Sequence, residues 1–386
     1  MQVTETIKYV GVNDHDIDLF EGQYDVRENG MAYNSYVVIG EKVAVTDTVD
    51  ARFVDEWLGN VETALDGRTP DYLVVHHMEP DHSAGIVAFM DRYPDAQIVA
   101  SKMAFKMMAA YFGTDFSDRQ IVCKEGFELN LGSRTLRFIG ASNVHWPEVM
   151  FSYDSQDKVL FSADAFGKFG ANDIEDPEGW ACEARRYYFG IVGKFGKNVQ
   201  AVLQKVAAFD VECICPLHGP VLSENLAYYV ERYTTWAHYE PENSGVTIAY
   251  VSVYGHTKQA AEELARALEE RGQTVSLFDL ARDDMAEAVE DAFRYDRLVL
   301  ASITYAGDIF PFMTTFIHTL AEHAYQNRKV AFIESGTWAP VAAKAMRAQM
   351  EQMAGIEFAE TVVTVRGSVD DAARAQIAAL ANELAS

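Results

Sequence analysis

The stretch HHMEPDHSAG, residues 76–85, follows the apolar run DYLVV and constrains the fold more than any other part of the sequence. The apolar run predicts a buried strand, and titratable groups buried beside it without partners would be costly. A metal ion would stabilise them, so the stretch predicts a metal site at a strand end. In an extended segment His77, Glu79 and Asp81 point the same way, so one loop can direct three ligands at one place. His76 is out of phase with His77, and we expect it either to support the ligands from behind or to be structural.

Three more ligand-type residues follow predicted strands, where layered α/β folds collect functional side chains. The candidate metal ligands are then His77, Glu79, Asp81, His82, His145, Asp164 and His218. Seven ligands exceed the needs of one tetrahedral ion, so we infer two metals bridged by a carboxylate. Imidazole mixed with several carboxylates suits iron, and Glu79 stands where a zinc hydrolase of this type would have a second histidine. A surface cluster of polar residues is the alternative, and the preceding apolar run argues against it.

The sequence pattern changes at HYEPENSG, residues 238–245, whose Pro, Asn, Ser and Gly predict a linker. Before it, strands, helices and ligand-bearing loops predict one layered α/β domain, residues 1–243. After it, strands and helices alternate strictly, which predicts a doubly wound parallel sheet in a second domain, residues 244–386.

The first strand-to-helix turn of the second domain is a candidate phosphate site, because hydroxyls and backbone N–H groups there meet the positive end of a helix. It lacks the glycine fingerprint of dinucleotide sites and the lysine of a P-loop. Two later loops, SITYAGDIF and ESGTWAP, follow strands at the same sheet edge, and their Tyr305 and Trp338 can stack on a flat ring. Core packing is the alternative for either aromatic alone, but three loops together favour flavin mononucleotide (FMN). The candidate FMN-binding residues are Ser252, Tyr254, Gly255, His256, Thr257, Thr304, Tyr305, Ala306, Gly307, Ser335, Gly336, Thr337 and Trp338.

Composition narrows the partners and the compartment. The formal net charge of −26 argues against binding to nucleic acid or anionic membranes. The most apolar long window is interrupted by Asp308 and Pro311, so no membrane span is expected. No signal peptide is recognised at the N-terminus, and we expect a cytoplasmic protein. The four cysteines form no C-x-x-C pair, which excludes a rubredoxin-like or zinc-ribbon module, and Cys213 and Cys215 are expected to be buried core thiols.

These residues closely resemble the flavodiiron proteins (A-type flavoproteins) over almost the whole chain. The resemblance implies a metallo-β-lactamase-like αββα sandwich followed by a flavodoxin-like domain, with two non-haem iron ions and FMN as cofactors. The seven ligands match the family motif H-x-E-x-D-H…H…D…H. One iron would take His77, Glu79 and His145, and the other would take Asp81 and His218. Asp164 would bridge them, and the residue matching His82 is a ligand in some members and withdrawn in others.

The family reduces dioxygen to water, nitric oxide to nitrous oxide, or both, and needs no protein nucleophile. We lean to oxygen, because two irons and FMN together hold four electrons. The resemblance also implies a rubredoxin-like electron donor and a head-to-tail homodimer, alone or as a dimer of dimers, that brings one subunit's flavin beside the other's irons. The pair Tyr187-Tyr188 resembles a family tyrosine near the irons. We take Tyr188 and the flavin-side Trp338 as candidate catalytic residues.

Two other functions are compatible with parts of the sequence. One is a metal-dependent hydrolase of the metallo-β-lactamase type fused to a flavin electron-transfer domain, against which Glu79 and the three flavin loops argue. The other is an electron carrier with a vestigial metal domain, against which the complete ligand set argues.

Overall fold

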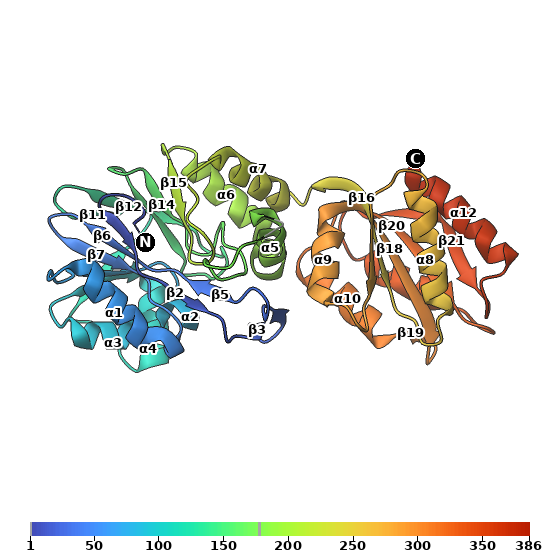
Figure 1. The fold of residues 1–386 in the computed structure, drawn as a ribbon, viewed down its shortest axis with the longest axis horizontal. Coiled ribbons are helices and arrows are strands. Elements are labelled where there is room, and N and C mark those ends of the chain that lie inside the picture. Colours follow the sequence, from blue (N-terminus) through green and yellow to red (C-terminus); the bar gives the residue numbers. More distant parts are fainter. Residues whose placement is uncertain (1, 177–178) are drawn as a thin grey trace. The chain divides into compact units, whose positions relative to one another are not determined.

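The structure is a computed structural model that describes residues 2–176 and 179–386. The chain divides into two compact units, Met1–Thr234 and Thr235–Ser386 (Figure 1). The division falls inside helix α7 (Leu226–Ala237). The domain boundary that we propose from the sequence, after residue 243, falls at the first residue of strand β16 (Asn243–Tyr250).

The first unit is an α/β sandwich around two sheets (Figure 1). One sheet has six strands in the order β1-β6-β7-β8-β9-β10, and the other has five in the order β11-β12-β13-β14-β15. The first sheet consists of β1 (Ile7–Tyr9), β6 (Tyr36–Ile39), β7 (Val43–Thr46), β8 (Tyr72–Val75), β9 (Gln97–Ser101) and β10 (Gln120–Cys123). The second consists of β11 (Glu128–Asn130), β12 (Thr135–Gly140), β13 (Met150–Asp154), β14 (Val159–Phe161) and β15 (Cys213–Cys215). The two remaining pairs are β2 (Val12–Asp14) with β5 (Met31–Tyr33) and β3 (Leu19–Phe20) with β4 (Tyr24–Asp25).

Helices cover the outer faces of the two sheets, as predicted for an αββα sandwich. Helices α1 and α4 pack on the six-stranded sheet and α6 on the five-stranded sheet. The helices of this unit before α7 are α1 (Val54–Leu65), α2 (Pro80–Ser83), α3 (Ile86–Arg92), α4 (Lys102–Phe112), α5 (Trp180–Tyr187) and α6 (Gly196–Val206), with 3-10 turns at Ala51–Phe53 and Gly193–Phe195 and a π-helical turn at Tyr188–Val192.

The core of the first unit lies between the two sheets. Val38, Val74 and Val99 of the six-stranded sheet meet Phe138 and Phe161 of the five-stranded sheet in one buried cluster. Cys213 and Cys215 belong to the same cluster and are thiols outside any disulfide, which confirms the expectation from sequence.

The segment MAYNSYVVIG is not one continuous strand. Its first part, β5, pairs with β2, whereas its second part, β6, joins the six-stranded sheet. Asn34 and Ser35 separate the two strands, and both are fully buried. At this break between the two strands, the side chain of Asn34 is directed toward the loop of residues 216–219.

The second unit is a doubly wound parallel sheet with the strand order β17-β16-β18-β20-β21. The five strands pair in parallel, and the short β19 pairs antiparallel with the end of β18. This order, 2-1-3-4-5 in the chain, is that of flavodoxin-like folds, whose ligands bind at the carboxyl ends of the strands. Beyond β16, its elements are β17 (Val275–Asp279), β18 (Tyr295–Tyr305), β19 (Asp308–Ile309), β20 (Lys329–Ser335), β21 (Glu357–Val365), α8 (His256–Glu269), α9 (Met285–Arg294), α10 (Pro311–Glu322), α11 (Ala342–Met350) and α12 (Asp371–Ala385).

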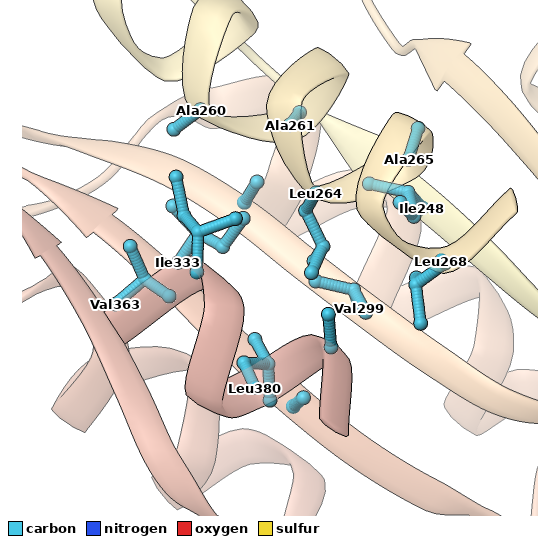
Figure 2. Close-up of a cluster of buried hydrophobic side chains, with 14 of the residues drawn as sticks. Ile248, Ala260, Ala261, Leu264, Ala265, Leu268, Val299, Ile333, Val363 and Leu380 are labelled. Carbon is cyan, nitrogen blue, oxygen red and sulfur yellow. The ribbon is translucent and has the colours of Figure 1, made fainter. Parts of the chain in front are cut away.

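Helices α8 and α12 pack against each other and against the sheet, and their apolar side chains form the core in Figure 2. Buried residues recur along α8 at positions 257, 260, 261, 264, 265 and 268, the spacing of an amphipathic helix. Leu264 lies among Ile248, Val299 and Ile333 of the strands and Leu380 of α12 (Figure 2). Within the described ranges, no helix is both long and apolar enough to cross a bilayer.

Replacing Leu264 by Ala should destabilise the second unit by about 2–5 kcal/mol, because a fully buried leucine leaves a cavity when truncated. Urea denaturation followed by fluorescence and circular dichroism measures the change. Arg266→Ala, on the exposed side of the same helix, is the matched control and should change stability by less than about 0.5 kcal/mol. Equal effects of the two substitutions would contradict the packing in Figure 2.

Candidate metal and flavin sites

The first ligand-bearing loop leaves the six-stranded sheet at the end of β8. Asp47 fixes this exit, because its Oδ1 accepts hydrogen bonds from the backbone N of His76 (2.7 Å) and of His77 (3.2 Å). The ring of His76 lies 2.6 Å from Asp47 Oδ2 through Nδ1 and 2.8 Å from Ser152 Oγ through Nε2. Both ring nitrogens of His76 are therefore occupied by structural contacts, as its phase in the sequence predicts.

Four predicted ligands form a first group: His77, Glu79, His145 and Asp164. His77 Nε2 lies 3.1 Å from Glu79 Oε2 and 3.1 Å from Asp164 Oδ2. His145 Nε2 lies 3.0 Å from the same two oxygens. All four ligand atoms lie within 4.8 Å of one another, which is close enough for a single cation to contact them.

The other three predicted ligands, Asp81, His82 and His218, form a second group. His82 Nε2 lies 2.9 Å from His218 Nε2 and 3.3 Å from Asp81 Oδ2. The backbone explains the separation from the first group. Residues 80–83 form the short helix α2, so Asp81 does not continue the extended phase of His77 and Glu79. The expectation that one extended loop directs residues 77, 79 and 81 at one place is therefore wrong for Asp81.

Asp164 lies between the two groups and offers one oxygen to each. Its Oδ2 faces the first group, whereas its Oδ1 lies 3.5 Å from His82 Nε2 and 3.8 Å from His218 Nε2. The carboxylate is fully buried in the turn after β14. This is the geometry of a carboxylate that can bridge two cations.

The buried carboxylate oxygens of the two groups are suited to binding cations. Both oxygens of Asp81 are buried and accept no hydrogen bond from any described residue, and both oxygens of Asp164 lie near imidazole nitrogens outside hydrogen-bond geometry. Buried carboxylates left in this condition would be costly, and cations would satisfy them. Two groups that each combine histidine with carboxylate, and share Asp164, suit two metal ions of the iron type.

The electrostatics show how tightly the groups interact. Burial alone would lower the pKa of His145, but Asp164 and Glu79 outweigh it and raise the pKa to about 9. Burial raises the pKa of Asp81 to about 7, with the charges of Glu79 and Asp164 adding to the effect against that of His82. Burial and the neighbouring His82 lower the pKa of His218 to about 3. A neutral His218 ring is the form that ligates a metal.

Contacts behind the ligands fix the orientation of their rings. Glu148 Oε1 lies 2.8 Å from His77 Nδ1 and also accepts the backbone N–H of Met78 at 2.9 Å. His218 Nδ1 donates to the backbone oxygen of Ala32 at 2.8 Å. In both rings the outer nitrogen is thereby engaged, and Nε2 is directed at the ligand group.

Aromatic rings surround the second group. Phe20 and Tyr33 contact the ring of His218 at centroid distances of 5.4 and 6.0 Å. Tyr187 also lies 5.4 Å from His218, whereas Tyr188 packs 5.1 Å from both Phe189 and Tyr233. Of the ring contacts of the described residues, that of Tyr187 reaches the ligand His218, whereas those of the candidate Tyr188 reach Phe189 and Tyr233.

The second unit has a cavity of about 390 Å³ at the carboxyl end of its sheet. All predicted FMN-binding residues line this cavity except Gly255 and Tyr305. Gly255 is the N-cap of α8 with a positive φ of 92°, and its N–H donates to Ser252 Oγ. Tyr305 stands outside the lining with its ring against Phe310.

The three predicted loops are tied to one another around the cavity. Thr257 Oγ1 lies 2.8 Å from Ser335 Oγ, which joins the first loop to the third. Thr304 Oγ1 accepts the backbone N–H groups of Val341 and Ala342, which joins the second loop to the start of α11. Tyr254 and Trp338 at the cavity are 86% and 89% exposed, so core packing does not explain either ring. A helix N-terminus, hydroxyls and exposed aromatics together fit a flat phosphorylated ligand.

Comparisons with known proteins match both units. Residues 31–219 match the family model described as ODP family beta lactamase, and residues 247–372 match that of a flavodoxin domain. The anaerobic nitric oxide reductase flavorubredoxin of Vibrio vulnificus is 29% identical over 374 residues, which span 94% of this chain and 75% of the relative. The solved rubredoxin oxygen:oxidoreductase of Desulfovibrio gigas is 26% identical with a TM-score of 0.92, over 100% of this chain and 97% of that one. The solved flavodiiron protein of Giardia intestinalis shares the fold, with a TM-score of 0.90 at 21% identity over 99% and 96% of the two chains.

This chain belongs to the flavodiiron protein family. The order of its two units is the one that the resemblance in sequence implies. For a flavodiiron protein, the flavodoxin domain implies a flavin, and the two ligand groups are a possible metal site.

Several residues at these sites escaped the sequence analysis. Glu148 follows His145 by only three residues, and a carboxylate so close to a ligand in a loop was the available signal. Gly367 lines the flavin cavity from the loop after β21, a fourth strand end at the same sheet edge. Phe20 and Tyr33 carried no signal, because an aromatic residue in a strand predicts only core packing.

Replacing Glu148 by Gln should weaken metal binding by the first group about 10–100-fold, because the neutral amide supports the His77 ring less well than the carboxylate does. Titration of metal-depleted protein with Co²⁺ measures the affinity. Glu125→Gln makes the same chemical change at a half-exposed surface carboxylate and should leave affinity unchanged. An unchanged first site in Glu148→Gln would disprove the orienting role.

Proposed function

We propose that this flavodiiron protein reduces dioxygen to water, nitric oxide to nitrous oxide, or both, at two non-haem irons in its first unit, with electrons supplied through FMN in its second unit. The observation that carries the proposal is the pair of ligand groups that share Asp164, in the same chain as a flavin-type cavity. The names of the relatives support the two gases as substrates, since one is a nitric oxide reductase and the other a rubredoxin oxygen:oxidoreductase.

The cofactors, when bound, supply two electrons from two ferrous ions and two from reduced FMN, which matches four-electron reduction of dioxygen and exceeds the two electrons that nitric oxide coupling needs. The chain's own residues hold and shield this site. His77 and His218 keep Nε2 inward because Glu148 and Ala32 O engage the opposite nitrogens. The rings of Phe20, Tyr33 and Tyr187 make the surroundings of His218 apolar, which suits small apolar gases and limits water.

The residues also distinguish this proposal from a metal-dependent hydrolase. Glu79 and the shared Asp164 give the first group two carboxylates with two histidines, an oxygen-rich set that favours iron over zinc. Elemental analysis and a visible spectrum of the purified protein test the proposal directly. Two irons and one FMN per chain are expected, followed by turnover with one or both gases after anaerobic reduction. Two zinc ions, or flavin without metal, would contradict it.

The proposal includes a rubredoxin-like electron donor, a cytoplasmic location and a head-to-tail homodimer in which one subunit's flavin serves the other's irons. The names flavorubredoxin and rubredoxin oxygen:oxidoreductase among the relatives support the donor. The buried thiols Cys123, Cys213 and Cys215, which form no disulfide, are compatible with a reducing compartment. The nearly complete exposure of Tyr254 and Trp338 at the cavity supports a partner surface there.

Asp164→Ala should lose metal from both groups, because each group loses its shared oxygen, and turnover with either gas should disappear with it. FMN content should stay that of the wild type, since the flavin cavity is formed by the second unit alone. Asp157→Ala is the control. The part-buried Asp157 carboxylate accepts hydrogen bonds from Thr4 and Thr6 and is not a candidate ligand, so this variant should keep both irons. Full turnover in a metal-depleted Asp164→Ala protein would refute the site.

Dilution below the dimer dissociation constant should stop reduction of the gases while each chain keeps its FMN and iron. Analytical ultracentrifugation gives the oligomeric state, and stopped-flow absorbance follows flavin reoxidation at each concentration. The rate per chain should follow the dimer fraction. A monomer that reoxidises its flavin at the rate of the dimer would exclude transfer between subunits.

A further inference from the structure

Asn34 is a fully buried polar residue that is neither a candidate metal ligand nor part of the flavin cavity. It stands at the break between β5 and β6, where the chain passes from one pair of strands to the six-stranded sheet. Its side chain reaches the loop 216–219, which carries His218 and lies far away in the sequence.

The amide of Asn34 holds this loop on both sides of His218. Its Nδ2 donates to the backbone oxygens of Pro216 (2.9 Å) and Gly219 (2.8 Å). Its Oδ1 accepts from Asn172 Nδ2 at 3.0 Å. Both amide protons are thus used on carbonyl groups that flank the ligand, and the orientation of the amide is determined by those carbonyls.

The backbone of the same segment adds two further contacts. The N–H of Asn34 donates to Leu217 O at 2.8 Å, and Ala32 O accepts from His218 Nδ1 at 2.8 Å. One short stretch of chain therefore holds both the loop and the ring of His218. The loop has two further anchors, because Leu217 N–H donates to Ala163 O and Tyr36 Oη donates to Pro216 O.

The first ligand group is supported by other residues. Asp47 holds the backbone at His77, and Glu148 holds the His77 ring. The hydrogen bonds of the Asn34 side chain go to Pro216, Gly219 and Asn172, and none of these is a ligand of the first group. The two halves of the metal site thus have separate supports, although they share Asp164.

We propose that Asn34 is a positioning residue for the second metal group alone, and that loss of its amide weakens the second cation while the first remains bound. This inference rests on the proposed function, in that it requires two cation sites. It concerns affinity and holds for any divalent ion that both groups accept.

The test is a Co²⁺ titration of metal-depleted, FMN-loaded protein, followed by visible absorbance and by direct metal analysis. Wild-type protein should bind two ions per chain. Asn34→Leu has nearly the same shape but cannot donate, and it should bind its first ion as the wild type does and its second about 10–100-fold more weakly. Asn34→Asp, which sets a carboxylate against two carbonyl oxygens, should show the same selective loss and serves if the leucine variant does not fold.

Ser35→Ala is the matched control. Ser35 is equally buried at the next position, but its Oγ contacts Asp47 O and Trp57 Nε1, not the loop 216–219. It should lower the melting temperature without selectively weakening the second ion. Wild-type affinity for both ions in both Asn34 variants, or equal weakening of the two ions, would overturn the proposal. A wild-type chain that binds fewer than two ions would overturn the proposed function and this inference together.

Discussion

The two groups of candidate metal ligands are joined by one residue, because both face the carboxylate of Asp164. Each of its oxygens faces a different group of ligands, and burial removes water as an alternative partner. Around it lie four histidines and the carboxylates of Glu79 and Asp81, so close together that the pKa values of the histidines move in opposite directions, up for His145 and down for His218. The rest of the first unit can be understood as the frame that keeps these groups together.

That frame works through hydrogen bonds behind the ligands. Asp47 and Asn34 hold the backbone of the loops that carry His77 and His218, and Glu148 holds the ring of His77. In the flavin cavity, too, hydrogen bonds hold the loops in place. There the hydroxyls of Thr257 and Ser335 join loops from two strands, and the exposed rings of Tyr254 and Trp338 stand at its edge.

The sequence indicated the candidate metal ligands and the candidate flavin loops because both consist of chemically unusual residues directly after apolar runs. Charged groups such as Glu79 beside a buried strand have few explanations, and the alternation of strand and helix after residue 245 leaves few folds. The residues that support the ligands were harder to predict from the sequence. Glu148 and Asn34 are ordinary residues whose roles depend on contacts across 71 and more than 180 positions of the chain, respectively. The choice between Tyr187 and Tyr188 depends on the direction of two adjacent side chains, which a family pattern alone does not specify.

The ligand loops do not come from a single sheet. His77 follows β8 of the six-stranded sheet, whereas Asp164 and His218 follow β14 and β15 of the five-stranded sheet. Ions bound between them would therefore act as a clamp across the sandwich, in addition to the apolar core and the hydrogen bond between His76 and Ser152 that join the two sheets. By mass action, metal bound at the two ligand groups would raise the free energy of unfolding of the first unit, and flavin bound in the cavity would raise that of the second. Loss of metal would then loosen the first unit and leave the second intact.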